Sequence, residues 1–174
     1  MKNIKKFLAV FFMILFSISV AACKTASLEQ KPFDRSIIST SSIDKEVTVG
    51  DIVWRVDNSE YLGSQIPSDT GDILEATYGR FIGVEFNVEN IGQDIRTIID
   101  LKVIDGKGRE FPICAAAYGF LGIGEACLLV DVYPDTNQTF FASFDVPLDS
   151  VDLILEISDL GTPPADKAYI DLGI

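Results

Sequence analysis

The sequence predicts an all-β protein, an immunoglobulin-like antiparallel β-sandwich of seven or eight strands. From Val47 onward, apolar and polar residues alternate in short runs, which is the pattern of strands with one buried and one exposed face. Gly, Pro, Asn and Asp separate these runs, as expected for turns. No segment keeps a helical apolar period for more than a turn or two. Many short strands within one domain are typical of a sandwich.

The strands follow one another in chain order. In the first, Ile52, Trp54 and Val56 share one face, so we expect all three to be buried. The clearest strand runs from Ile82 to Val88, where apolar residues alternate with glycine, glutamate and asparagine. The same alternation predicts strands at residues 99–103, 109–113, 139–146, 153–157 and 169–172.

Turn residues divide these strands. Asn90-Ile91-Gly92 is predicted to form a turn, and Asp105-Gly106-Lys107-Gly108 supplies the positive-φ residues of a hairpin. Pro147 is expected to end the strand at 139–146, because proline has no backbone N–H to donate to a neighbouring strand.

The composition limits the function. A chain of 174 residues suffices for one domain, and its 48% apolar content predicts a buried core. With 14 basic and 26 acidic residues the net charge is -12, which disfavours nucleic acid and anionic lipid head groups and favours a cation or a basic partner. The absence of histidine excludes Ser-His-Asp and Cys-His catalysis and His-ligated zinc. We therefore expect no catalytic residue, no metal and no cofactor.

The amino terminus has the features of an export signal. Residues 2–6 contain three lysines, and the apolar run from Phe7 to Val20 is shorter than the about 20 residues that span a bilayer, as in a signal peptide. Val20-Ala21-Ala22-Cys23 then resembles the bacterial lipobox, which implies that Cys23 is acylated and becomes the new amino terminus. A plain secretory signal with an incidental cysteine is the alternative.

Three parts are therefore predicted: a lipoprotein signal peptide at residues 1–22, a lipid-anchored flexible tether at 23–46, and the sandwich domain at 47–174. The tether is rich in Ser, Thr and charged residues, which is typical of a solvated spacer, and an extra edge strand at 36–39 is the alternative. The lipid would hold the protein at the cell membrane or outer membrane, facing outside the cytoplasm. Lys24 after the acylated cysteine favours the outer membrane in a cell with two membranes.

Motifs spread over the predicted domain resemble one family, the DUF4352 (telokin-like) immunoglobulin-fold lipoproteins. These motifs are Val49-Gly50-Asp51 followed by Trp54, Gly79-Arg80-Phe81, the run from Val84 to Gly92, the run from Asp105 to Phe111, and the run from Phe144 to Pro147. The resemblance implies an immunoglobulin-like sandwich in the cell envelope and carries over no catalytic residue. The run from Tyr133 to Asn137 departs from the polar Pro-Gly turn that such sequences tend to have before the last hairpin.

Two cysteines remain once Cys23 is acylated. Cys114 and Cys127 lie in a chain that is predicted to be exported, where disulfides persist, so we expect a disulfide between them. Two buried thiols, or a metal or redox role, are the alternatives. A bridge closing such a loop would stabilise the domain by roughly 3 kcal/mol.

The segment between these cysteines carries four large apolar residues, Tyr118, Phe120, Leu121 and Ile123, and no charge from residue 115 to residue 124. One interpretation is that it folds over an open end of the sandwich. The other is that the four side chains form an exposed apolar patch that binds a partner, because large exposed patches mark contact sites.

Acidic residues indicate an alternative function. Asp69 and Asp72, and Asp131 and Asp135, lie in or near predicted loops, and calcium prefers such oxygen ligands. We therefore expect a non-enzymatic cell-envelope lipoprotein that presents its domain for protein or ligand interaction, with the membrane as a partner through the anchor and an envelope protein as another. A calcium- or small-ligand-binding accessory lipoprotein is the alternative.

Overall fold

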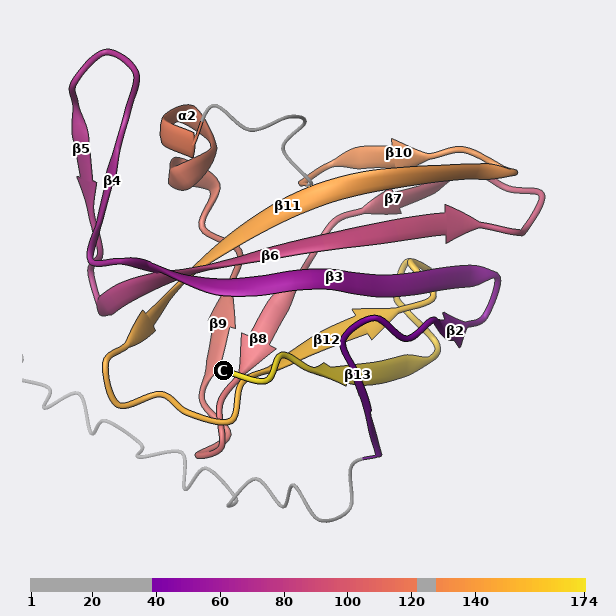
Figure 1. The fold of residues 1–174 in the computed structure, drawn as a ribbon. Helices are drawn as coiled ribbons and strands as arrows, with labels where there is room; N and C mark the ends of the chain where they lie inside the picture. The colour runs from indigo at the N-terminus through magenta and orange to yellow at the C-terminus, as the bar shows by residue number, and fades with distance from the viewer. Residues whose placement is uncertain (1–38, 122–127) are drawn as a thin grey trace, which may run out of the picture. The chain divides into compact units, whose positions relative to one another are not determined.

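The computed structural model describes residues 39–121 and 128–174, and this part of the chain is all-β, as predicted (Figure 1). The predicted signal peptide, Cys23, Ile123 and Cys127 lie outside the described residues. Besides strands, the described part holds a 3-10 helix, η2 (Ala115–Ala117), and a short helix, α2 (Tyr118–Leu121). The strands are β1 (Thr40–Ser42), β2 (Val47–Val49), β3 (Ile52–Gly63), β4 (Gln65–Pro67), β5 (Ile73–Glu75), β6 (Gly79–Asn90), β7 (Arg96–Ile98), β8 (Lys102–Ile104), β9 (Glu110–Pro112), β10 (Val130–Val132), β11 (Thr136–Pro147), β12 (Ile154–Ser158) and β13 (Lys167–Asp171).

Two sheets form the layers of the sandwich. The first has the order β11-β6-β3-β2, is antiparallel throughout, and contains three strands of 12 residues. The second has the order β1-β13-β12-β8-β9, in which only the β1–β13 pair is parallel among the described strands. β10 pairs with β7, and β4 pairs with β5 in a hairpin that projects beside α2 in Figure 1.

The hydrophobic core lies between the two sheets and contains residues of both. Trp54 on β3 and Leu155 on β12 have no exposed surface. The Trp54 ring lies 5.7 Å from the Phe86 ring, and its Nε1–H donates to the Ser158 carbonyl oxygen at 2.9 Å. Since β3 and β12 belong to different sheets, this hydrogen bond joins the two layers. The prediction that alternate residues of the first strand are buried is confirmed.

The folded domain begins earlier than predicted. β1 lies within the predicted tether, yet it pairs with β13, with Thr40 opposite Tyr169. The Asp44 N–H then donates to the Val56 carbonyl oxygen at 2.8 Å. This strand could not be predicted from the sequence, because its threonine and serine residues produce no apolar alternation. Its pairing uses backbone groups, which leave no pattern in the side chains. The folded domain therefore begins before Val47. β1 lies just after residues 36–39, the range of the alternative edge strand, and residues 36–38 lie outside the described part of the chain.

The strand segments are also more numerous than the seven or eight predicted. Of the strand predicted at 99–103, only Lys102 and Val103 lie in a strand, β8, while β7 ends just before the predicted range. β7 and β8 pair with different neighbours. The β4–β5 hairpin was not predicted, because its sequence has few apolar residues and contains Pro67. In contrast, β11 ends at Pro147 as predicted.

The hairpin between β8 and β9 is built around one buried carboxylate. The Asp105 side chain is 0% exposed and accepts hydrogen bonds from the backbone N–H groups of Lys107 at 3.0 Å and Arg109 at 2.9 Å. The Arg109 guanidinium donates to the same carboxylate at 2.7 Å and to Asp149 at 2.9 Å. Gly108 has the positive φ of 78° that the predicted hairpin requires. The Arg109 guanidinium therefore joins Asp105 in this turn to Asp149 in the segment that follows β11.

Candidate functional site

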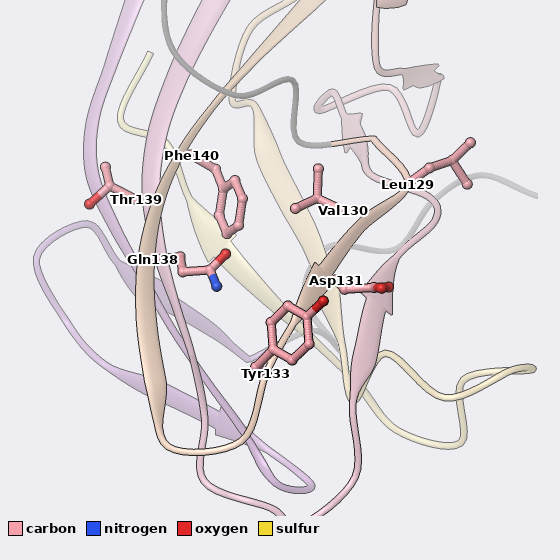
Figure 2. Close-up of a pocket in the computed structure, with 7 residues that line it drawn as sticks. All are labelled: Leu129, Val130, Asp131, Tyr133, Gln138, Thr139 and Phe140. Carbon is pink, nitrogen blue, oxygen red and sulfur yellow. The ribbon is translucent and has the colours of Figure 1, made fainter.

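An open groove of about 720 Å³ lies between β10 and the first half of β11. Figure 2 shows Gln138 and Phe140 extending from β11 toward β10, whereas Thr139 points to the opposite side of its strand. The lining residues are Leu129, Val130, Asp131, Tyr133, Gln138, Thr139 and Phe140. A cavity of this size has room for a short peptide or a small ligand.

The groove exists because β10 and β11 follow each other in the chain without pairing. β10 pairs with β7, while β11 is an edge strand that pairs with β6. The two strands meet at the turn from Tyr133 to Asp135, in which Asp135 has a φ of 55° and the Thr136 N–H donates to the Tyr133 carbonyl oxygen at 3.3 Å. This is the segment where the sequence departs from the pattern of the lipoproteins that it resembles.

A buried amide holds β10 in place. Asn90, at the end of β6, is 0% exposed, and its Nδ2 group donates to the Val132 carbonyl oxygen at 2.9 Å and to the Asp94 carbonyl oxygen at 2.8 Å. The backbone carbonyl oxygen of Asn90 accepts from the Asp135 N–H at 2.8 Å. These bonds fix the end of β10 against β6, so the closed end of the groove is rigidly placed.

The groove has an apolar rim and a buried floor. Leu129 is 71% exposed and Tyr133 is 51% exposed, whereas Phe140 is 3% exposed. Leu129 also has a φ of 61°, a conformation that is uncommon for a bulky residue and that marks a constrained backbone. Among the described lining residues, Asp131 is the one charged side chain, and it accepts a hydrogen bond from the Thr97 hydroxyl at 2.7 Å.

The predicted disulfide is only half described. Cys114 is a half-buried free thiol, and its backbone N–H donates to the Ser143 carbonyl oxygen of β11 at 2.7 Å. Cys127 lies outside the described residues. The bridge between them therefore stays a prediction.

The apolar residues predicted to bind a partner are in contact with the protein itself. Tyr118 is half-buried against the main core. Phe120 and Leu121 are half-buried against a second cluster formed by Ile66, Phe81 and Ala117, next to the β4–β5 hairpin. This placement favours the interpretation that the segment covers an end of the sandwich, and it disagrees with an exposed patch at these three positions.

We expect the double substitution Phe120→Ser and Leu121→Ser to lower the free energy of unfolding by about 2 kcal/mol, because two half-buried apolar side chains lose their contacts with the second cluster. Denaturant unfolding of the purified protein measures this. Leu129→Ser is the control, because a side chain that is 71% exposed should change stability little. Equal stability of the double variant and the wild type would restore the exposed-patch interpretation.

The acidic pairs do not form a cation site in the described part of the chain. Asp72 lies in the β4–β5 turn, where it accepts from the Thr70 hydroxyl at 3.0 Å, and Asp69 is exposed in the same turn. Asp131 lies on β10 and Asp135 in the turn that follows. Across residues 39–121 and 128–174, no group of three or more Asp, Glu, Cys or His could hold a metal ion.

The fold and the groove define a β-sandwich protein with an open edge, and comparisons with solved structures agree with this class. The yjhA protein of Bacillus subtilis matches with a TM-score of 0.57 at 12% identity, covering 76% of this chain and 99% of its own. The secreted protein MPT63 of Mycobacterium tuberculosis matches with a TM-score of 0.50 at 12% identity, covering 77% of this chain and 97% of its own. The proposed lipoprotein ycdA of Bacillus subtilis strain 168 matches with a TM-score of 0.51 at 14% identity, covering 78% of this chain and 40% of its own.

These matches show that the chain shares its fold with other bacterial proteins. No protein-family model matches the sequence, and no curated protein matches it either. In the described residues, no helix has the length and apolar content needed to cross a membrane.

Proposed function

We propose that this chain is a non-enzymatic lipoprotein of the bacterial cell envelope that is related to the DUF4352 family and binds another protein through the groove between β10 and β11. The observation that carries the proposal is the pair of exposed apolar residues, Leu129 and Tyr133, on the rim of a groove with the buried Phe140 as its floor. Exposed aromatic and aliphatic side chains around a concave surface are typical of contact sites.

The amino-terminal sequence supports the location. The leader ends in Val20-Ala21-Ala22-Cys23, and acylation of Cys23 would hold the domain on the outer side of a membrane. Two of the structural neighbours are described as a secreted protein and as a proposed lipoprotein, and both descriptions agree with an exported protein.

The chemistry of the groove supports binding over catalysis. Its polar side chains are one carboxylate, one amide, one phenol and one hydroxyl, on Asp131, Gln138, Tyr133 and Thr139. The chain contains no histidine, so a neutral-pH imidazole base is not available. A carboxylate without a partner acid or base would not provide general acid–base catalysis.

A photo-reactive amino acid at position 129 tests this proposal in cells that express the full chain. We expect irradiation to join the protein to an envelope protein, because Leu129 lies on the groove rim. Position 148 is the matched control, because Leu148 is 69% exposed but follows the far end of β11, about 30 Å along the strand from Gln138.

Crosslinked products are separated by electrophoresis and identified by mass spectrometry. A product that forms from position 129 and not from position 148 supports a binding site at the groove. No product from position 129, or the same products from both positions, contradicts it.

A further inference from the structure

We propose that the outer edge of β11 binds an extended, positively charged segment of a partner protein as an added β-strand in the groove. This inference rests on the proposed function and specifies how that site would recognise its partner. Three features support it: the backbone directions of β11, the short length of the other sheet edges and the charge of the groove.

The backbone direction of β11 can be assigned from one hydrogen bond. β11 pairs with β6 from Thr136 to Pro147 without a change of register. On the other side of β11, the Ser143 carbonyl oxygen accepts from the Cys114 N–H at 2.7 Å, so the backbone groups of Ser143 point away from β6. In an antiparallel pair, residues alternate between facing the partner and facing away. The backbone N–H and C=O groups of Phe141 and Thr139 therefore also point away from β6, toward the groove.

These outward groups are unpaired within the part of the chain that the structure describes. Beyond Ser143, Ile113 bridges Phe144 and covers the far half of the edge. Over the near half, β10 pairs with β7 and not with β11. An extended segment in the groove could therefore bond to the N–H and C=O groups of Thr139 and Phe141, as in other cases of strand addition to a sheet edge.

The edge of β11 lacks the features that usually prevent strand addition. Natural sheet edges are short, or carry lysine, proline or a bulge. Among the described strands, β1, β2 and β9 form the other edges of the two main sheets, and each is only three residues long. β11 has 12 residues, and its segment at 138–144, QTFFASF, contains no charge and no proline. Among the described edges of the two main sheets, β11 is therefore the one long edge, and its segment at 138–144 lacks the features that prevent strand addition.

The side chain of Phe141 does not cover this edge. Its ring lies against Gly83 on β6, where a β-carbon would overlap the ring. The ring thus packs over the interior of the sheet, which leaves the backbone of Phe141 open to an incoming strand. Gly83 provides the space for this arrangement because it has no side chain.

The charge of the groove selects a basic segment. Asp131, on the opposite side of the groove from β11, is exposed and is the one charged residue among the described lining residues. The whole chain carries a net charge of -12, which repels acidic segments and speeds the approach of basic ones. Alternation in a strand places every second side chain on one face, so a segment in which lysine or arginine alternates with apolar residues fits both the floor and Asp131.

The test uses the full-length lipidated protein in detergent and three fluorescent peptides of about eight residues. The first alternates valine and lysine, the second is the same peptide with alternate backbone nitrogens methylated, and the third alternates valine and glutamate. We expect the valine–lysine peptide to bind saturably, as measured by fluorescence anisotropy. Methylation should weaken binding about tenfold, because it removes two or more backbone hydrogen bonds, and the glutamate peptide should bind at least as weakly.

Two further measurements locate the site. Asp131→Asn should weaken the valine–lysine peptide about threefold through loss of one exposed charge pair, while Asp69→Asn, an exposed acid in the β4–β5 turn, should not. Hydrogen exchange of the Thr139 and Phe141 amides should slow on peptide binding, whereas the Gln138 amide, which faces β6, should not change.

Equal binding of the methylated and unmethylated peptides, or no binding of the valine–lysine peptide, overturns strand addition. Dimer formation by the protein would also overturn the proposal if the Thr139 and Phe141 amides were protected from exchange without peptide. A second copy of the chain would then occupy the edge of β11. These outcomes are separate from the crosslinking test. If position 129 gives a specific crosslinked product but methylated and unmethylated peptides bind equally, the proposed function stands and strand addition fails. If the peptides bind as an added strand but no crosslinked product forms, strand addition stands and the proposed function fails.

Discussion

Replacement of Cys23 by serine is expected to abolish incorporation of a labelled fatty acid into the protein. Thioether and amide attachment of lipid requires the cysteine at the end of the Val20-Ala21-Ala22-Cys23 motif, and serine provides no thiol. Cys114→Ser is the matched control, since it removes a sulfur from the folded domain and should label as the wild type does. The measurement is gel fluorescence of cells grown with an alkyne-tagged fatty acid.

Mass spectrometry of the amino-terminal peptide gives the second readout. The wild type should begin at residue 23 with a mass that includes two or more acyl chains, whereas Cys23→Ser should lack this species. Each buried methylene contributes about 0.8 kcal/mol, so two chains anchor the protein stably. Membrane fractionation alone would not distinguish the two proteins, because an unprocessed variant keeps its apolar leader. An intact leader or an unmodified Cys23 in the native protein would contradict the anchor.

Substitution of Asp105 by alanine is expected to lower the free energy of unfolding by about 3 kcal/mol. The variant leaves the backbone N–H groups of Lys107 and Arg109 without their buried acceptor and removes one of the two carboxylate partners of the Arg109 guanidinium. Equilibrium denaturation of the purified protein measures the change. Asp100→Ala is the control, because Asp100 is exposed just before β8 and should change stability little.

The contribution of Asp105 should also depend on pH. Burial acts to raise the pKa of Asp105, but the hydrogen bonds from Arg109 and Lys107 together outweigh it and lower the pKa below its usual value. A carboxylate with a lowered pKa in the folded state stabilises the protein above its unfolded pKa of about 4, and this stabilisation is lost as the pH falls through the folded value.

The difference in unfolding free energy between the wild type and Asp105→Asn should therefore be constant from pH 5 to pH 8 and shrink below about pH 4. Hydrogen bonds from the Lys107 ammonium and the Arg109 guanidinium lower the pKa of Asp149 to about 2, but Asp149 is present in both proteins, so its own titration largely cancels from this difference. A difference that is independent of pH, or one that grows on acidification, would show that the Asp105 carboxylate is not held as an anion in the folded protein.

Much of the sandwich could be predicted, because the pattern of apolar residues within a few positions shows which residues of a strand are buried. Residues two apart lie on the same face of a strand, so the alternation from Ile82 to Val88 predicted which residues of β6 enter the core, and all four apolar residues of that run are buried. The hairpin at Asp105 was predicted for the same reason, since its turn requires particular residues at neighbouring positions.

The candidate site could not be predicted in the same way. The sequence indicated Tyr118, Phe120, Leu121 and Ile123 as exposed partner residues or as a cover. The half-buried contacts of the first three favour the cover, and these contacts join segments that are distant in the sequence. The groove depends on β10 pairing with β7, from which it is separated by more than thirty residues. One local signal was present, the uncharged run from Gln138 to Phe144, but it predicts a strand equally well at a sheet interior and at an edge.

By itself, the sequence determined the acidic charge, the absence of imidazole chemistry and the order of the main strands, and it predicts an export signal that ends at Cys23. These properties depend on residue identity or on a spacing of a few residues. Only the tertiary structure decided that β1 belongs to the domain, that Asn90 fixes β10, and that the backbone of Thr139 and Phe141 faces an open groove. Strand pairing is a contact between distant segments made by backbone groups that every residue carries, so side-chain pattern alone does not specify which edge stays open.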